Sequence, residues 1–361
     1  MTLSDMNWMD MDLPAMKEAM KELGEPAFRA SQVFSWLHRG RDFAEMSNLG
    51  AALRSKLAKA RPLGGVKVLQ KLVSSKDGTA KYLFLLEDGN IVEGVLMHHK
   101  HGNTICISTQ VGCRMGCTFC ASTLNGLVRN LRPGEMLSAV AVVNREQMEA
   151  EGLKEGRAIA NIVLMGSGEP LDNYDNVLAF LRLVNAKEGL NISFRNISLS
   201  TCGLVPKMRE LADSGVPVTL SVSLHAPEDE MRKKLMPIAN RYSVAEVVDA
   251  AKYYVGVTGR RVIFEYALIR GTNDTPECAQ KLAALLKGFQ CHVNLIPLNE
   301  VKERGMQGTA RDDAKRFMEQ LNALGLSATI RREMGADIEG ACGQLRRRYL
   351  ADRATGAEGE E

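Results

Sequence analysis

The second half of the chain alternates short apolar runs with amphipathic stretches of helical length. The apolar runs are 161–166, 196–201, 218–225, 262–269, 292–298 and 327–333, and the helical stretches between them are 176–186, 205–215, 244–259, 278–289 and 312–325. A strand, a helix and a second strand in this order pair as parallel strands through a right-handed crossover. The sequence therefore predicts an α/β fold with a parallel sheet, in which functional loops follow the C-terminal ends of the strands.

The N-terminal third is patterned differently. Apolar residues at helical spacing predict helices over 13–24, 27–40 and 50–60, with Gly24 ending the first and Pro26 opening the second. Between residues 66 and 108, β-rich runs separated by turn signals occupy 67–73, 81–86, 90–97 and 103–108. We therefore divide the chain into a small helical domain (1–60), a β-rich connecting extension (61–103), an α/β core (104–342) and a tail (343–361).

Composition excludes several classes of protein. With 361 residues and 45% hydrophobic content, the chain can bury a large core. Its 46 basic and 43 acidic residues give a net charge of only +3, so any nucleic-acid surface must come from local clustering. No apolar run approaches the roughly 18 residues of a membrane span, and the N-terminus lacks a signal-peptide pattern, so we expect a cytoplasmic protein.

The tail combines Arg346, Arg347 and Arg348 with an acidic end that lacks apolar periodicity, so we expect it to be partly disordered. The chain's eight cysteines are too sparse for the disulfide framework of a secreted protein. A reducing compartment favours metal-binding or catalytic thiols instead.

Three of these cysteines are closely spaced, as Cys113-x3-Cys117-x2-Cys120 in QVGCRMGCTFCAST. Three soft thiolates at this spacing suit an iron–sulfur cluster with one iron left unligated. The alternatives are a zinc site or buried thiols, but structural zinc requires four ligands and no second Cys or His pair with zinc-site spacing is present. The motif therefore favours an iron–sulfur cluster with an iron that is open to chemistry.

This motif resembles the signature of radical S-adenosylmethionine (SAM) enzymes, in which SAM occupies the fourth iron of a 4Fe-4S cluster. Cys106 lies seven residues upstream of the motif, Glu93 precedes Cys113 by twenty, and Cys342 lies in ADIEGACGQL near the end. Together these residues resemble the RlmN family of dual-specificity 23S rRNA and tRNA adenine-C2 methyltransferases. The resemblance implies a partial, six-stranded (β/α)6 barrel.

The resemblance also implies a division of labour among the cysteines. Cys113, Cys117 and Cys120 would hold the cluster, and two SAM molecules would be used per turnover. Cys342 would accept a methyl group from the first, and a radical formed from the second would abstract hydrogen from that S-methyl group, so that the methylene carbon adds to adenine C2. Cys106 would release the product through a disulfide with Cys342 after Glu93 accepts the C2 proton. A thiolate suits these roles because it is a strong nucleophile.

If the resemblance to the family is set aside, several of these residues have simpler interpretations. A lone cysteine on an apolar strand, such as Cys106, is most often a packing residue, and Glu93 would be a surface carboxylate. Cys342 is different, because the small residues around it are typical of a loop that carries a thiol to a substrate. The remaining cysteines are assigned to the core: Cys202, Cys278 and Cys291.

Candidate SAM contacts follow the predicted strands. GSGEP at 166–170 matches the family's GEP motif, although the family often has methionine where Ser167 stands; Gly168 would let the backbone approach SAM and Glu169 would receive its ammonium group. By resemblance, the further SAM contacts are Ser200, Ser223, Leu224, His225 and Asn299. A buried, hydrogen-bonded histidine is an equal alternative for His225.

The implied partners are 23S rRNA, tRNA and an electron donor such as flavodoxin, for a chain that is plausibly a monomer. Basic residues that could bind RNA phosphates are present in the first helices and at Lys233, Lys234, Arg331, Arg332 and Arg346–Arg348. Taken singly, each of these is usually an ordinary solvent-exposed charge. An adenine C2 inside a stacked stem requires the base to be extruded.

Three other functions remain open on the sequence. A related adenine-C8 rRNA methyltransferase that confers antibiotic resistance shares Cys106 and Cys342, but it tends to have alanine where Pro170 stands, and the loop CRMGCTFC is closer to the C2 group. An activase that installs a glycyl radical on a partner protein would not need Cys106 or Cys342. A non-catalytic iron–sulfur RNA-binding protein would leave GSGEP, Ser223 and Asn299 without a purpose.

Overall fold

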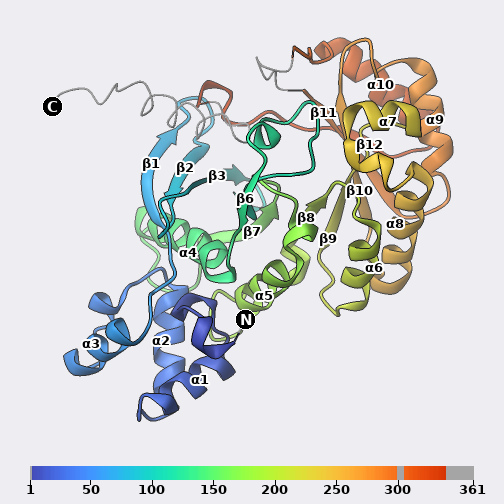
Figure 1. The fold of residues 1–361 in the computed structure, drawn as a ribbon. Helices are drawn as coiled ribbons and strands as arrows, with labels where there is room; N and C mark the ends of the chain where they lie inside the picture. Colours follow the sequence, from blue (N-terminus) through green and yellow to red (C-terminus); the bar gives the residue numbers. More distant parts are fainter. Residues whose placement is uncertain (1, 299–304, 339–361) are drawn as a thin grey trace.

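The computed structural model describes residues 2–298 and 305–338, and its centre is a ten-stranded sheet in the order β1-β2-β3-β4-β7-β8-β9-β10-β11-β12. Pairings from β1 to β4 are antiparallel, and those from β4 to β12 are parallel. The sheet curves into a partial barrel with β1 and β12 at its open ends, and helices cover its outer side (Figure 1). The predicted α/β fold with a partial parallel barrel is therefore confirmed.

The parallel part is built from strand–helix units. Its strands are β4 (Gly102–Ile107), β7 (Ile159–Leu164), β8 (Ile197–Thr201), β9 (Thr219–Ser223), β10 (Val262–Leu268), β11 (Cys291–Pro297) and β12 (Ala328–Ile330). Its helices are α4 (Pro133–Ala150), α5 (Tyr174–Asn185), α6 (Val205–Asp213), α7 (Asp229–Leu235), α8 (Val244–Thr258), α9 (Pro276–Leu286) and α10 (Arg311–Ala323). Each of the six predicted apolar runs overlaps a strand, and each of the five predicted helical stretches overlaps a helix.

Shorter elements connect these units. The hairpin β5 (Gln110–Gly112) and β6 (Leu127–Asn130) encloses the cysteine motif and was not predicted. Single helical turns are η4 (Ala121–Thr123), η5 (Pro170–Asn173), η6 (Phe194–Asn196), η7 (Pro237–Asn240) and η9 (Ala336–Ile338).

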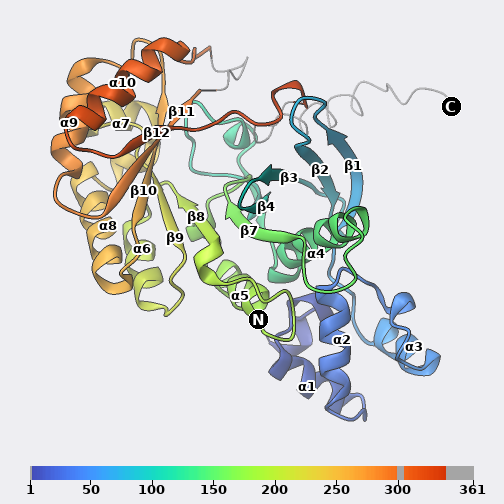
Figure 2. The ribbon, with the colours of Figure 1, turned by 180° about the vertical axis from the view of Figure 1, so that it is seen from behind.

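The N-terminal part contains the three predicted helices, α1 (Leu13–Glu22), α2 (Arg29–His38) and α3 (Ala51–Ala60), with the turns η1 (Leu3–Asp5), η2 (Trp8–Asp10) and η3 (Phe43–Glu45). The β-rich runs form β1 (Lys67–Val73), β2 (Ala80–Leu85), β3 (Ile91–His99) and β4. Because β4 also pairs with β7, the extension and the barrel share one continuous sheet. Figure 2 shows this continuity from behind, with the N-terminal helices below α4.

Helix α4, which was not predicted, joins the N-terminal helices to the barrel. Eleven of its first twelve residues are buried because they contact the sheet on one side and α2 and η2 on the other. The Asp10 carboxylate accepts hydrogen bonds from the Gly134 amide at 2.9 Å and from Arg132 Nε at 2.9 Å. Gly134 permits this approach, since a Cβ there would lie 2.7 Å from the Met9 backbone carbon. A carboxylate at a helix N-terminus is favourable for the helix dipole.

The barrel strands alternate between two kinds of side chain. In β8 and β9, Ile197, Leu199, Leu220 and Val222 pack in the main core under the helices. The serines between them face the lumen: Ser198, Ser200, Ser221 and Ser223. Successive strand residues point to opposite faces, so this pattern gives an apolar outer layer and a lumen of small polar groups.

His38 lies where the N-terminal helices meet the barrel. Its ring is 2% exposed, packs against Phe34 with a centroid distance of 4.0 Å, and has no hydrogen-bond partner on either nitrogen. A Cβ on Gly189 would lie 2.3 Å from His38 Nδ1, so glycine is required opposite the ring. Burial lowers the pKa of His38 from 6.5 to about 3, because the charged form loses its hydration.

Replacing His38 by leucine should flatten the acid dependence of stability. Between the unfolded pKa of 6.5 and the folded pKa of about 3, the unfolded state binds a proton that the folded state excludes. Stability therefore falls by up to about 1.4 kcal/mol per pH unit as the pH drops through this window. Urea unfolding of the wild type and of His38→Leu at about pH 7 and about pH 5 measures the difference. The exposed His101→Leu is the control, and equal acid sensitivity in all three proteins would contradict the prediction.

Candidate functional site

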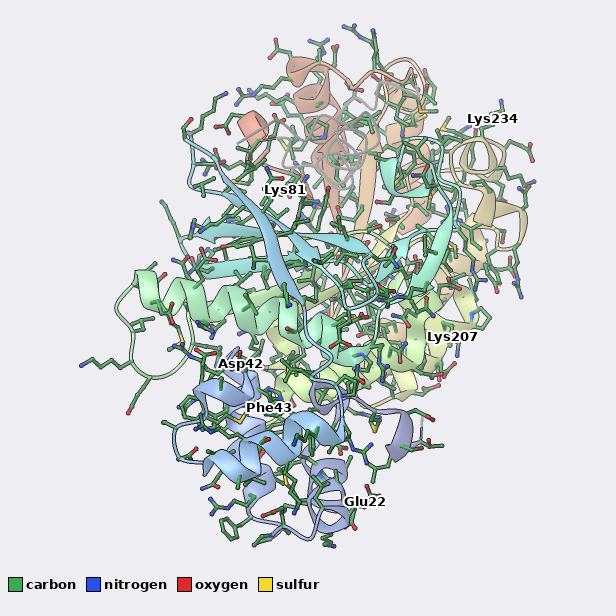
Figure 3. The ribbon with its side chains drawn as sticks, turned by 60° about the vertical axis from the view of Figure 1, so that its left-hand side comes forward. Glu22, Asp42, Phe43, Lys81, Lys207 and Lys234 are labelled. Carbon is green, nitrogen blue, oxygen red and sulfur yellow. The ribbon has the colours of Figure 1, made fainter. Side chains whose placement is uncertain are left out.

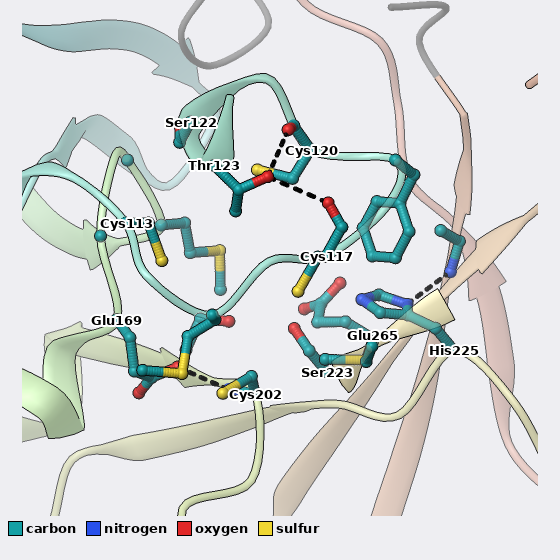
Figure 4. Close-up of a pocket in the computed structure, with 18 of the residues that line it drawn as sticks. Cys113, Cys117, Cys120, Ser122, Thr123, Glu169, Cys202, Ser223, His225 and Glu265 are labelled. Carbon is teal, nitrogen blue, oxygen red and sulfur yellow. Dashed lines mark hydrogen bonds between the residues drawn. The ribbon is translucent and has the colours of Figure 1, made fainter. Parts of the chain in front are cut away.

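A cavity of about 290 Å³ opens where the parallel strands end, as predicted for a fold of this class (Figure 4). The cysteine loop forms one wall, the loops that follow β7, β8 and β9 form others, and residues of β10 and β11 complete the lining. The lining includes eight residues that were predicted to bind the cluster or SAM: Cys113, Cys117, Cys120, Gly168, Glu169, Ser200, Ser223 and His225. Residues from several strands and from the loops that follow them thus meet in one place.

Backbone hydrogen bonds fix the cysteine loop. The Cys113 amide donates to Gly126 O at 2.9 Å, which closes the loop at its base. The Thr123 hydroxyl donates to Cys117 O at 3.1 Å and to Cys120 O at 2.9 Å, as the dashed lines in Figure 4 show. Cys113 and Cys117 are buried and Cys120 is half-buried, so the three thiols are held on a preformed loop.

Two of these thiols are protonated when no metal is bound. Burial raises the pKa of Cys113 to about 12 and raises that of Cys117 further, so both keep their protons until metal binding displaces them. In the described part of the chain no three His, Cys, Asp or Glu side chains converge on one point closely enough to hold a single metal ion. The thiols instead share a cavity wall, which fits a cluster in which each thiolate binds a different iron.

Glu169 is the charged group of the opposite wall. Its side chain is 4% exposed; Oε1 accepts from the Leu171 amide at 3.0 Å and Oε2 from the Cys202 amide at 2.7 Å. The pKa of Glu169 is raised overall, because the effect of burial outweighs the opposite effect of these two backbone donors. The carboxylate is therefore fixed in position and keeps lone pairs for a cationic ligand such as an ammonium group.

The glycines of GSGEP allow close packing within the protein, a role that the sequence analysis did not predict. A Cβ on Gly166 would lie 2.7 Å from the Ile107 backbone, and one on Gly168 would lie 2.6 Å from the Gln110 Cβ. The glycines thus allow the loop to pack on the 107–110 backbone, where the Glu169 amide donates to Gln110 Oε1 at 2.8 Å. Gly168 also lines the cavity, so close packing and access to a ligand coexist.

His225 has a defined tautomer. Its Nδ1 accepts a hydrogen bond from the Ala267 amide at 2.9 Å, so the neutral ring carries its proton on Nε2. Burial lowers its pKa to about 3, and the ring meets Phe119 edge to face at 4.9 Å. Its φ of 57° is rare for a residue with a side chain. His225 is therefore both a buried, hydrogen-bonded histidine and a neutral donor at the cavity.

One predicted SAM contact among the described residues, Leu224, does not line the cavity. The Leu224 side chain is fully buried in the main core; its amide donates to Glu265 O and its carbonyl accepts from Arg232, so neither backbone group is free for a ligand. Asn299 and Cys342 lie outside the described residues, as does the predicted tail 343–361.

Cys202 is a cavity residue that the sequence analysis assigned to the core. It lines the same cavity and packs with Cys117, 6% exposed, directly after β8. Its position directly after a strand of the parallel sheet was the available signal, because functional residues of such folds follow the C-terminal ends of the strands. Cys278 is buried in the core as predicted, and Cys291 is half-buried on β11.

Cys106 lies in a second cavity of about 420 Å³ inside the barrel. The two cavities share the residues Met165, Glu265, Ile296 and Arg331, so they adjoin. The second cavity is polar at Glu265, whose Oε2 accepts from Asn294 Nδ2 at 2.9 Å and whose pKa is raised by burial. Cys106 is thus separated from the cluster thiols by one shared wall.

Glu93 is buried rather than exposed. It is 6% exposed and lies 3.3 Å from the Nζ of Lys81, which is completely buried. Glu93 and Cys106 belong to paired strands, since Val95 is the register partner of Cys106. Glu93 is two residues before Val95 on β3, so its side chain and that of Cys106 lie on the same face of the sheet. Figure 3 shows Lys81 within the sheet, whereas Lys234 projects from the outer side of α7. The surface-carboxylate interpretation of Glu93 is therefore wrong.

The predicted basic residues differ in their surroundings. Arg331 and Arg332 are both exposed; Arg331 lines both cavities and Arg332 lines the second. Lys233 pairs with Glu230 at 2.8 Å on the surface of α7. Among the described helices none is long and apolar enough to cross a membrane.

Comparisons with family models cover most of the chain. Residues 6–61 match the "Ribosomal RNA large subunit methyltransferase N-terminal domain", and residues 107–285 match the "Radical SAM superfamily".

Individual relatives match almost the whole chain. A "Probable dual-specificity RNA methyltransferase RlmN" of Clostridium perfringens (strain 13 / Type A) is 55% identical over 96% of this chain and 98% of its own length. One from Lachnospira eligens is 52% identical over 92% and 93%. The crystal structure of a radical SAM methyltransferase from Sphaerobacter thermophilus superposes with a TM-score of 0.90 at 42% identity, covering 94% of this chain and 98% of that one.

The packing of the GSGEP loop predicts an unequal response to two alanine substitutions. Gly168 has a φ of 109° and no room for a Cβ, whereas Gly215 has a φ of 72° and open space around it. Gly168→Ala should cost about 3 kcal/mol of unfolding free energy or more, and Gly215→Ala about 1 kcal/mol. Urea unfolding measures both; equal costs would show that the Gln110 contact does not constrain the loop.

Proposed function

The chain belongs to the RlmN family of radical SAM RNA methyltransferases, and we propose that it methylates C2 of adenosine through a methylated Cys342. The targets are an adenosine in the peptidyl-transferase region of 23S rRNA and the adenosine 3′ of the tRNA anticodon, in the cytoplasm. The observation that carries this proposal is the adjacency of two cavities, one lined by the three motif cysteines and the other by Cys106.

Residues of the first cavity would hold the cofactors. The cluster ligands are Cys113, Cys117 and Cys120, and the SAM contacts are Gly168, Glu169, Ser200, Ser223 and His225, with Asn299 beyond the described residues. When bound, the reduced 4Fe-4S cluster supplies the electron that cleaves SAM to a 5′-deoxyadenosyl radical. The fixed Glu169 carboxylate orients the SAM ammonium group, and the Nε2 proton of His225 is available to a ligand oxygen or nitrogen.

Cys342 is the proposed methyl carrier, and the described residues before it support this role. Met334 lines the cavity of Cys106. Three residues later, the Asp337 carboxylate accepts from Ser74 Oγ at 2.6 Å and from the Ser75 amide at 3.0 Å. A chain spans at most about 3.6 Å per residue, so this attachment keeps Cys342 within about 18 Å of Asp337. The first SAM of each turnover would methylate Cys342, and the second would supply the radical.

Cys106 and Glu93 complete the proposed reaction. After the methylene radical on Cys342 has added to adenine C2, the adduct would lose one electron, which the oxidised cluster could accept, and its C2 proton, which Glu93 would accept. The Cys106 thiolate then attacks the Cys342 sulfur, so the S–CH2 bond breaks as the disulfide forms and the carbon is protonated to a methyl group. The Glu93 carboxyl group lies 3.3 Å from the Nζ of the completely buried Lys81, and this contact holds it in position within the sheet.

RNA would approach from the side of Arg331 and Arg332, which line the second cavity. Guanidinium groups at a cavity mouth contact phosphates while an extruded base occupies the cavity. The enzyme would act as a monomer and receive electrons from a donor such as flavodoxin.

Regiochemistry tests the proposal. The anaerobically reconstituted protein, supplied with SAM, a reductant and deproteinised 23S rRNA or tRNA, should yield 2-methyladenosine when the RNA is digested and analysed by mass spectrometry. The variant Cys342→Ala should yield none. Methylation at C8, or transfer to a protein instead of RNA, would contradict the proposed function.

Cys106→Ala should trap the enzyme on its substrate. Without the Cys106 thiol the thioether between Cys342 and adenine C2 persists, so stoichiometric protein–RNA adduct accumulates and multiple turnover is lost. Denaturing gels followed by mass spectrometry of the crosslinked peptide measure the adduct. Cys278→Ala, a change at a buried cysteine away from both cavities, is the matched control and should release product. Normal turnover by Cys106→Ala would rule out the disulfide step.

A further inference from the structure

Arg232 on α7 is a completely buried cation whose hydrogen-bond acceptors are backbone carbonyls. Its Nη2 donates to Cys202 O at 2.6 Å and to Ser223 O at 3.2 Å, and its Nε donates to Leu224 O at 3.2 Å. A longer contact of 3.5 Å joins Nη1 to Tyr242 O. The guanidinium therefore lies directly behind the loops that follow β8 and β9, two walls of the first cavity.

The charge of Arg232 is not neutralised by a carboxylate in the described part of the chain. None of the ion pairs found there includes Arg232. The carboxylate that affects it most is Asp229, one turn earlier on α7, whose charge acts to raise the pKa of Arg232. Asp229 does not pair with Arg232; its Oδ1 accepts a hydrogen bond from the Val244 amide at 2.7 Å. Burial lowers the pKa of Arg232, as expected for a desolvated cation. A buried charge without a counter-charge costs several kcal/mol, so an anion in the adjoining cavity would offset that cost.

The helix that carries Arg232 is attached to the cysteine loop. Leu235 O accepts from the Thr118 amide at 2.9 Å and from the Thr118 hydroxyl at 3.2 Å. Leu235 and Met236 pack in one apolar cluster with Cys117 and Cys202. The positions of the guanidinium and the cluster thiols are therefore coupled through a short, rigid path.

We propose that Arg232 is an electrostatic positioning residue for the iron–sulfur cluster, whose buried charge raises the cluster's reduction potential. The inference rests on the proposed function, since it assumes a cluster on Cys113, Cys117 and Cys120. Three thiolates make the site anionic, and reduction adds one more electron to it. A fixed cation in a low-dielectric wall stabilises the reduced form more than the oxidised form. Net charge and burial are among the factors that set the potentials of such clusters.

A purely structural role makes a different prediction. If Arg232 only ties the carbonyls of Cys202, Ser223 and Leu224 together, then the number of its N–H donors matters and its charge does not. Lysine keeps the charge and loses the planar fork, whereas glutamine keeps amide N–H donors and loses the charge. The two substitutions therefore separate the two roles.

The test is a redox titration of the reconstituted cluster, followed by its EPR signal, in the wild type, Arg232→Lys and Arg232→Gln. Arg232→Gln should shift the midpoint potential to a more negative value, and Arg232→Lys should stay near the wild type. The matched control is Lys233→Gln, because Lys233 is the next residue, partly exposed and paired with Glu230; it should leave the potential unchanged. An unchanged potential in Arg232→Gln, or equal shifts in the Gln and Lys variants, overturns the proposal.

Asp229→Asn keeps the test decisive if Arg232→Gln does not fold. An asparagine oxygen can still accept from Val244, but the carboxylate charge near Arg232 is gone, so the potential should become more positive. No shift in this variant would also overturn the proposal. A wild-type protein that takes up iron and sulfide without forming a cluster would contradict the proposed function instead, and the two failures are therefore distinguishable.

Discussion

The alternation of apolar and small polar residues along the barrel strands is the constraint on which the site depends. Residues such as Leu199 and Val222 bury their side chains under the helices, and burial of this kind is the main stabilising term of the fold. The serines between them, among them Ser200 and Ser223, are too small to fill the lumen. The core therefore lies outside the sheet, and the interior keeps two adjoining cavities without loss of the packing that holds the barrel together.

Polar groups in this interior are kept in place by backbone partners. Glu169 accepts from two amides and His225 accepts from one, while Arg232 donates to several carbonyls. Each bond satisfies a buried group and ties the loop after one strand to a neighbouring segment. The loops are thus ordered before any ligand arrives, which lowers the entropic cost of binding.

The strands and most helices could be predicted because their hydrophobic periodicity is local. Helix α4 was missed because it is buried against both the sheet and the N-terminal helices, so its sequence lacks a clear polar face. The three motif cysteines were recognised by spacing alone. Arg232 was not recognised: in DEMRKKL it looks like its neighbour Lys234, which is exposed. Which residue of such a run is buried depends on carbonyls that come together only in the folded chain.

The β-rich extension contributes residues to the proposed catalytic site and does not only cover the edge of the barrel. Strands β2 and β3 supply Lys81 and Glu93, and the turn between β1 and β2 holds the chain that leads to Cys342. At that turn Asp77 Oδ2 accepts from the Gly335 amide at 3.0 Å, next to the contacts of Asp337 with Ser74. The segment from β12 to η9 therefore crosses the open side of the barrel between two fixed ends (Figure 2). A barrel without this extension would have neither the proposed proton acceptor Glu93 nor the attachment point for the segment that leads to the proposed methyl carrier, which is consistent with both belonging to one continuous sheet.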